Sequence, residues 1–116
     1  MSVYDSTVLT DAPFIFYRLG DVTSTMFDDS GGGWNGTFSG SGYTQGQASL
    51  VGDGEGSVLW SGGYASAAPT VLLGGAGGIS DFTLECWMKM PSGGASFQIF
   101  FGNWSAAGCG LDVFNG

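Results

Sequence analysis

The stretch FTLECWMK at residues 82–89 decides the fold prediction, together with DAPFIFYRLGD at residues 11–21. In residues 82–89 the side chains alternate between two faces, as they do along a β-strand. One face would carry Phe82, Leu84, Cys86 and Met88, and the other would carry Thr83, Glu85, Trp87 and Lys89. Both faces are largely apolar, which predicts a strand inside a two-layer β-sandwich.

Composition indicates one small β-rich domain spanning residues 1–116. The chain is 43% hydrophobic and 15% aromatic, which is enough for a packed core, and its 23 glycines suit short strands joined by tight turns. No stretch shows a helical period with capping signals at its ends. We therefore predict an almost entirely β chain.

The predicted elements follow the apolar runs between glycines and prolines. Residues 6–9 are expected to form a short extended piece, residues 39–57 a loop-rich region, and residues 69–79 a hydrophobic connection. Strands are predicted over residues 14–19, 34–38, 57–60, 64–67, 82–90, 96–102 and 110–114.

The charge of the chain limits its partners. Two basic residues against ten acidic ones give a net charge of −8. Nucleic acids and anionic membrane surfaces are bound through clustered Lys and Arg, so neither is expected as a partner. No run of about 18 apolar residues is present, so we expect no membrane insertion, and the first residues lack the pattern of a secretion signal.

Five short motifs, in order along the chain, resemble the laminin G-like (concanavalin A-like) jelly-roll domains. They are Pro13 with Tyr17, Arg18, Leu19, Gly20 and Asp21; Asp29, Ser30, Gly31, Gly33, Gly36 and Thr37; Gly62, Gly63 and Tyr64; Phe82, Thr83, Glu85 and Trp87; and Gly110, Leu111, Val113, Asn115 and Gly116. The resemblance implies an antiparallel β-sandwich of which the chain covers the N-terminal half to two-thirds. It implies a fold and no particular ligand.

The opening residues 1–21 are similar to the start of minor tail proteins from phages that infect actinobacteria. This resemblance implies a non-enzymatic structural and adhesion module of a phage virion, which contacts other tail subunits or a glycan on the host surface. The alternative is a carbohydrate-binding module of a secreted bacterial protein, assisted by calcium. A third interpretation is a homo-oligomer whose subunits complete one another's sheets.

Arg18 and Glu85 are predicted to form a buried structural salt bridge. Both lie in the middle of predicted strands, and a buried charge is tolerated mainly when it is paired. The alternative is that Arg18 reaches solvent at the rim of a sheet. Trp87 is expected in the core beside them, as is Trp60.

A calcium site is predicted at Asp21, Asp28, Asp29 and Asn35, which surround a glycine-rich loop. Calcium takes several oxygen ligands, which carboxylates, amides and backbone carbonyls supply. The alternative is ordinary turn chemistry, in which Asp and Asn side chains bond to nearby backbone groups.

Trp104 and Trp34 are the predicted glycan-binding residues, because both lie in expected loops or at their edges, where an exposed ring could stack on a sugar.

Catalysis is not expected. The chain has no histidine, which excludes Ser-His-acid and Cys-His machinery, and Glu85 has no second acid nearby on its strand. Cys86 is predicted to be a buried free thiol, and a bridge from Cys86 to Cys109 is left open.

Overall fold

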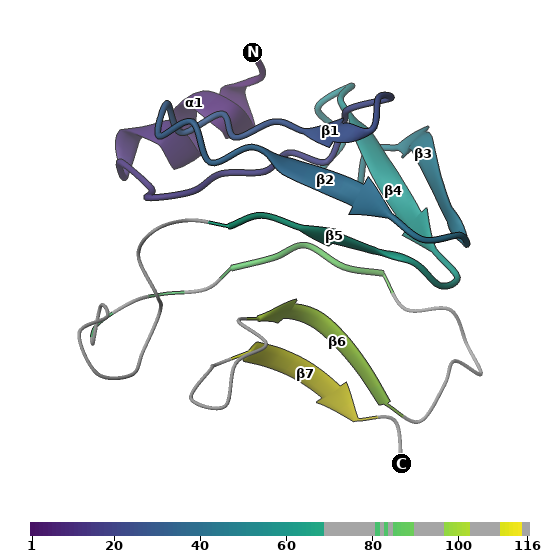
Figure 1. The fold of residues 1–116 in the computed structure, drawn as a ribbon. Coiled ribbons are helices and arrows are strands. Elements are labelled where there is room, and N and C mark those ends of the chain that lie inside the picture. Colours follow the sequence, from purple (N-terminus) through teal and green to yellow (C-terminus); the bar gives the residue numbers. More distant parts are fainter. Residues whose placement is uncertain (69–80, 82, 84, 90–96, 103–109, 115–116) are drawn as a thin grey trace. The chain divides into compact units, whose positions relative to one another are not determined.

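The structure, a computed structural model, describes residues 1–68, 81, 83, 85–89, 97–102 and 110–114. The chain forms two compact units, Met1–Ala68 and Pro69–Gly116. The described elements are mostly strands in antiparallel sheets, with little helix (Figure 1). The predicted β-rich class is therefore confirmed, while a single domain over residues 1–116 stays a prediction.

Helix α1, Val3–Thr10, replaces the extended piece predicted at residues 6–9, so that prediction was wrong. Ser2 caps the helix: its hydroxyl accepts a hydrogen bond from the Asp5 N–H (3.1 Å), and the Asp5 carboxylate accepts one from the Ser2 N–H (2.7 Å). This reciprocal capping box satisfies two N–H groups at the start of the helix. The local bonds of the cap stabilise a helix that lacks a clear apolar face.

The strand predicted over residues 14–19 is also wrong, since none of these residues belongs to a sheet. The Phe16 backbone bonds instead to Asp28 and Asp29, which lie in the loop after β1. The Phe16 N–H donates to Asp28 Oδ1 (3.0 Å), and the Phe16 carbonyl accepts from the Asp29 N–H (2.8 Å). Leu19 has a φ of +60°, a left-handed conformation that interrupts an extended run.

A three-stranded antiparallel sheet holds the buried apolar side chains of the first unit. Its order is β1 (Thr25–Met26), β2 (Gly36–Ser39) and β5 (Tyr64–Ser66). The strands predicted at residues 34–38 and 64–67 are confirmed with shifted ends. Among residues 1–68 the buried apolar side chains are Met26 and Phe38, at 6% and 4% exposure.

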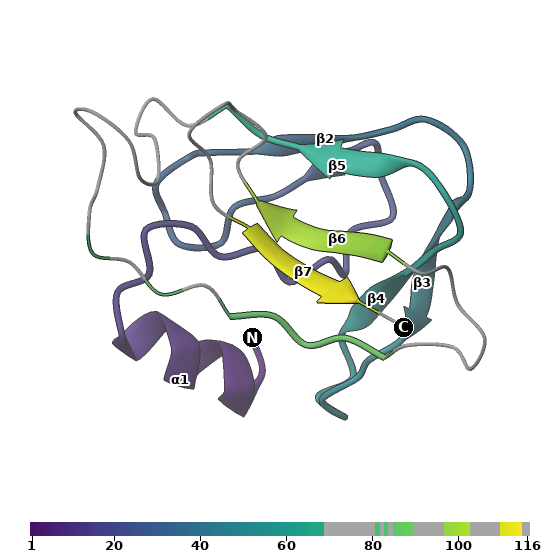
Figure 2. The ribbon, with the colours of Figure 1, turned by 90° about the horizontal axis from the view of Figure 1, so that it is seen from below.

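An antiparallel ribbon of β3 (Tyr43–Ala48) and β4 (Gly56–Trp60) completes the first unit. In Figures 1 and 2, α1 lies toward one end of the first unit and the β3–β4 pair toward the other. The β4 prediction is confirmed, but β3 was wrongly predicted as loop. Its register shifts between Thr44 and Gln47, where Gly46 takes a φ of +69°, so the glycine that suggested a loop forms a bulge within a strand.

Three aromatic rings join the sheet to the ribbon. Phe38 of β2 lies 5.5 Å from Tyr43 and 6.0 Å from Trp60, and the Tyr43 and Trp60 rings are 5.9 Å apart between centroids. Such pairs contribute beyond their buried area. Trp60, which was expected in the core, contacts the buried Phe38 ring but is itself only half-buried.

The second unit contains the antiparallel pair β6 (Phe97–Gly102) and β7 (Gly110–Phe114), which confirms both predicted strands. The predicted strand over residues 82–90 is wrong for its described residues, 83 and 85–89, none of which belongs to a strand. An alternating pattern sets the direction of side chains but does not provide a partner for the backbone, and a strand needs both. Residues 69–79 lie outside the described part of the chain.

Candidate functional site

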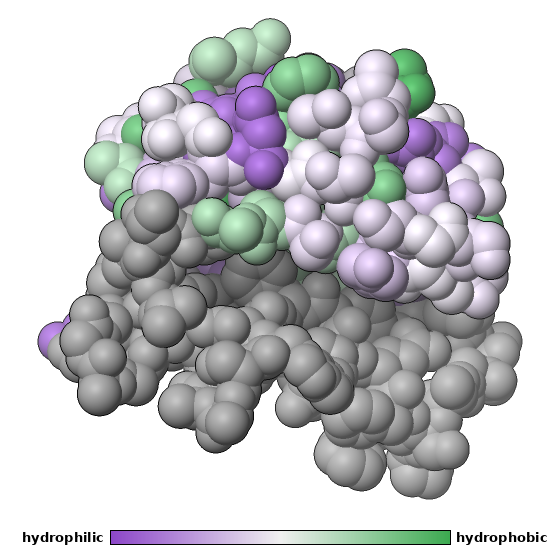
Figure 3. All heavy atoms as spheres, in the orientation of Figure 1, coloured by the Kyte–Doolittle hydropathy of each residue, from purple (hydrophilic) through white to green (hydrophobic). Residues whose placement is uncertain are grey.

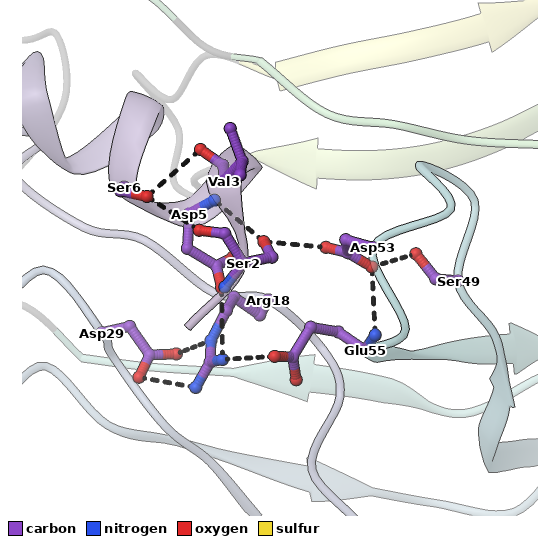
Figure 4. Close-up of polar contacts among 9 residues, drawn as sticks. All are labelled: Ser2, Val3, Asp5, Ser6, Arg18, Asp29, Ser49, Asp53 and Glu55. Carbon is purple, nitrogen blue, oxygen red and sulfur yellow. Dashed lines mark hydrogen bonds and ion pairs between the residues drawn. The ribbon is translucent and has the colours of Figure 1, made fainter.

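Within the described part of the chain, the densest cluster of charged side chains surrounds Arg18 (Figure 4). Its guanidinium makes two hydrogen bonds with the Asp29 carboxylate, Nε to Oδ2 at 2.7 Å and Nη2 to Oδ1 at 3.1 Å. Nη1 lies 3.4 Å from Glu55 Oε1 and 3.6 Å from Asp5 Oδ2. We call these four residues the Arg18 cluster.

The members of the Arg18 cluster come from separate segments of the first unit. Asp5 lies on α1, Asp29 on the loop after β1, and Glu55 directly before β4. The hydrogen bond with Asp29 is the main cause that raises the pKa of Arg18, and the charges of Asp29, Glu55 and Asp5 add to it. The cluster therefore holds three segments to one permanently charged side chain.

Asp5 is the most buried member, with 1% exposure. Its Oδ2 accepts from the Ser2 N–H and faces Arg18, whereas its Oδ1 has no hydrogen-bond partner among the described residues. A buried carboxylate oxygen without a partner is unusual and costly in proteins.

A second acidic residue, Asp53, extends the network to the loop before β4. Its Oδ1 accepts from the Ser49 hydroxyl and from the Glu55 N–H (3.1 Å), and its Oδ2 lies 3.4 Å from the Ser2 hydroxyl (Figure 4). The hydrogen bond from Ser49 is the main cause that lowers the pKa of Asp53. The bond to the Glu55 N–H fixes the backbone at the residue whose carboxylate contacts Arg18.

Asp28 organises the loop that carries Asp29. Its Oδ1 accepts from the N–H groups of Phe16 and Ser30, each at 3.0 Å, and its Oδ2 accepts from the Trp34 N–H at 3.0 Å. Burial acts to raise the pKa of Asp28, but hydrogen bonds from Ser30, Phe16 and Trp34 outweigh it, and the pKa is lowered.

The four residues predicted to bind calcium are brought near one loop but do not fit a calcium ion. Asp28 and Asp29 use both carboxylate oxygens, on backbone N–H groups and on Arg18 respectively. Asp21 accepts from the Phe27 N–H (2.9 Å), and Asn35 accepts from the Asp28 N–H (2.9 Å). Within the described residues no three acidic, His or Cys side chains are grouped so as to hold a metal. The geometry therefore favours turn chemistry, the alternative interpretation.

Trp34 is half-buried and packs against Phe14, with ring centroids 5.9 Å apart. Its carbonyl accepts a short hydrogen bond from the Tyr17 hydroxyl. Burial is the main cause that raises the pKa of Tyr17 to about 12, and the charge of Asp28 adds to it. Trp34 is thus part of the local packing, and Trp104, its predicted glycan-binding partner, lies outside the described residues.

The predictions for the 82–89 stretch need correction. Cys86 is a free cysteine and is exposed, although it was expected to be buried. Trp87 is 67% exposed and Glu85 is exposed, although both were expected inside. The burial of these side chains was inferred from a predicted sandwich strand over residues 82–90. The described residues of that stretch form no strand.

The salt bridge between Arg18 and Glu85 stays a prediction, because Glu85 belongs to the second unit. Within the first unit Arg18 already has three acidic neighbours, which the sequence interpretation missed. A signal for one of them was present: Ser2 and Asp5 have the spacing of a capping box. Glu55 and Asp53 had no such signal.

The described part of the chain contains no helix long and apolar enough to cross a membrane. Comparison of the chain with protein-family models, with curated proteins and with solved structures finds no match. The described part of the chain is thus rich in antiparallel β-sheet and carries a partly exposed charged cluster around Arg18.

Proposed function

We propose that the chain is a non-enzymatic structural and adhesion module of a phage virion, located in the tail and folded as part of a jelly-roll sandwich. The main support for this proposal is the structural role of the Arg18 cluster. The one basic residue of the first 68 is bound by three carboxylates, so this charge serves to hold the fold together. The antiparallel sheets and the five jelly-roll motifs of the sequence support the same assignment.

The surface of the first unit supports contact with other proteins. On the face drawn in Figure 3, apolar residues lie as separate patches among polar ones, and strongly hydrophilic residues are few. Only 10% of the residues of the chain are charged. Protein interfaces are about as apolar as other surfaces but carry few charges at their centre. We therefore propose neighbouring tail subunits as the partners, in a tail assembly or a homo-oligomer.

The test is mass spectrometry of purified particles of the phage that encodes the chain. Peptides of residues 1–68 should be present in intact tails in a fixed ratio to the other tail proteins. Their absence from particles, with recovery of the chain from the culture medium, would contradict the proposal and favour a secreted module.

Glycan binding is a second candidate, and the exposure of Trp87 favours it. An indole that is 67% exposed can stack on the apolar face of a sugar. Binding to a glycan array should be lost in Trp87→Ala and retained in Leu59→Ala, which removes another exposed apolar side chain. Equal binding by both variants would exclude Trp87 from a glycan site.

A further inference from the structure

Asn35 directly precedes Gly36, the first residue of β2, and its side chain is exposed. An asparagine followed by glycine is the pair most prone to deamidation, because the second residue has no side chain to hinder the nitrogen that attacks the amide. The packing requires glycine at this position, since a Cβ on Gly36 would lie 2.5 Å from Met26 Cε and 2.7 Å from the Ser66 carbonyl oxygen. The fold therefore keeps in place the residue that makes Asn35 reactive.

The pairing of β2 with β1 restrains the nitrogen that would react. Met26 of β1 lies opposite Gly36. The Phe38 N–H donates to the Ser24 carbonyl (2.9 Å), and hydrogen-bonded pairs recur at every second residue of an antiparallel ladder. Gly36, two residues before Phe38, is therefore in a hydrogen-bonded pair with Met26. The Gly36 N–H must leave this pair before its nitrogen can attack a side chain.

The strand that holds Gly36 is short. β1 consists of Thr25 and Met26 and lies at one edge of the described sheet, in the order β1, β2, β5. Directly after β1, the Phe27 N–H donates to Asp21 Oδ2 (2.9 Å), which fixes the end of the strand. Local opening of a short edge strand costs less free energy than unfolding of the whole unit.

We propose that Asn35 is a deamidation site gated by the pairing of β1 with β2. When β1 opens, the Gly36 nitrogen bonds to Asn35 Cγ, the bond from Cγ to Nδ2 breaks, and the side-chain nitrogen leaves as ammonia with the proton of the Gly36 N–H. Water then opens the resulting succinimide ring. Attack of water at Cγ gives aspartate. Attack at the main-chain carbonyl gives isoaspartate, in which the chain continues through Cγ and is one carbon longer.

The two products should affect the fold differently. Aspartate keeps the length of the chain and an oxygen that can accept from the Asp28 N–H, as Asn35 Oδ1 does at 2.9 Å. Isoaspartate inserts a carbon directly before Gly36, where β2 is closely packed against Met26 and Ser66. Extra atoms in a closely packed site force the backbone to shift. Isoaspartate at this position should therefore hinder β1 and β2 from pairing again in the same register.

Incubation of the folded chain and of the chain in guanidinium chloride, at the same pH and temperature, tests the gating. Peptide mapping by mass spectrometry assigns the reaction to Asn35 rather than to Asn115, which also precedes a glycine. Deamidation at Asn35 should be slower in the folded chain by about tenfold or more. Equal rates would overturn the gating, and the absence of reaction at Asn35 in the unfolded chain would overturn the site itself.

Variants of Asp21 test whether opening of β1 is the limiting step. Asp21→Ala removes the acceptor of the Phe27 N–H, so the folded chain should deamidate faster by about three- to tenfold. Asp21→Asn loses the charge but keeps an oxygen acceptor, and its rate should stay close to that of the unchanged chain. Asp11→Ala, which removes an exposed acid at the end of α1, is the control. In guanidinium chloride all four chains should react at the same rate.

Two results with these variants would contradict the proposal. If Asp21→Ala reacts no faster than Asp11→Ala, opening of β1 does not limit the reaction. If Asp21→Asn reacts as fast as Asp21→Ala, the charge of Asp21 sets the rate and the hydrogen bond does not.

The separated products supply a second readout. The chain with isoaspartate at position 35 should unfold at a lower denaturant concentration than the unchanged chain, and Asn35→Asp should lie closer to the unchanged chain. Equal stability of the isoaspartate form and the unchanged chain would contradict the effect on strand pairing.

Discussion

Arg18 and Asp29 form a two-point contact in which the guanidinium faces the carboxylate side on, with Nε–Oδ2 and Nη2–Oδ1 distances of 2.7 and 3.1 Å. This geometry fixes both side chains and leaves Nη1 directed at Glu55 and Asp5. Asp29 in turn is held because the preceding residue, Asp28, binds three backbone N–H groups of the loop and of residue 16. The first unit is therefore organised by acids around one base, with few buried apolar side chains.

The cap of α1 should contribute measurably to stability. Ser2→Ala removes the hydroxyl that accepts from the Asp5 N–H, and we expect a loss of about 1 kcal/mol in the free energy of unfolding. Chemical denaturation followed by circular dichroism measures it. Ser6→Ala is the control, because its exposed hydroxyl bonds only within the helix, and it should change stability by less than about 0.5 kcal/mol.

Acid should destabilise the chain through Asp28 and Asp53. Their pKa values are lowered by folding from an ordinary value of 3.8, so the unfolded chain binds protons first. The stabilisation is present above pH 3.8 and is lost as the pH falls through the folded pKa values. Denaturant titrations at decreasing pH test this.

Asp28→Asn should make the chain less stable near neutral pH and flatten the acid dependence. Asp11→Asn also removes one carboxylate, but an exposed one at the end of α1, outside the loop that Asp28 organises. This variant should lose stability in acid as the unchanged chain does. If the free energy of unfolding of Asp28→Asn falls with decreasing pH as steeply as that of the unchanged chain, the hydrogen bonds of the loop do not favour the ionised Asp28 carboxylate.

Alkali should destabilise the chain through Tyr17. Its pKa is raised from 10.0 to about 12, chiefly by burial, so the folded chain retains a proton that the unfolded chain loses. Stability is complete below pH 10 and should decrease between pH 10 and about pH 12. Absorbance titration of the phenol and unfolding curves should show this loss, and Tyr17→Phe should remove it. Tyr64→Phe, at an exposed position, should retain it.

Gly36 should tolerate no side chain. A Cβ at this position would lie 2.5 Å from Met26 Cε and 2.7 Å from the Ser66 carbonyl oxygen, and the second of these atoms belongs to the neighbouring strand β5. We expect Gly36→Ala to lower the free energy of unfolding by about 2 kcal/mol or more, as overpacking does. Thr37→Ala, at the exposed next position, should cost less than about 1 kcal/mol. Equal losses would show that β2 can move away from β5.

The parts of the fold that the sequence predicted are those defined by apolar runs between turns. β2, β4, β5, β6 and β7 were predicted because each contains a short apolar or aromatic stretch near glycine or proline. β3 was missed because YTQGQA has little apolar character and a glycine inside it. Helix α1 was missed because its stability comes from a two-residue cap, which leaves no period in the sequence.

The charged cluster shows why long-range polar contacts were harder to predict. Arg18 was identified as a paired structural residue because a base among buried segments needs a partner. The choice of Asp5, Asp29 and Glu55 depends on where α1 and two loops meet, which no local pattern encodes. Asp28 and Asn35 were predicted as oxygen-bearing loop residues. Their oxygens accept from backbone N–H groups, and the sequence does not show whether such oxygens meet an N–H or a metal ion.

A double-mutant cycle between Arg18 and Asp29 tests most directly whether the Arg18 cluster organises the first unit. Arg18→Leu alone should cost about 2–3 kcal/mol, less than a fully buried pair because the Arg18 side chain is 30% exposed. Lys89→Leu removes the other basic residue, which is exposed, and should cost less than about 0.5 kcal/mol. We predict that Arg18→Leu and Asp29→Leu together cost less than the sum of the single changes by about 1 kcal/mol or more. Additive losses, or a loss in Arg18→Leu no larger than in Lys89→Leu, would contradict the account.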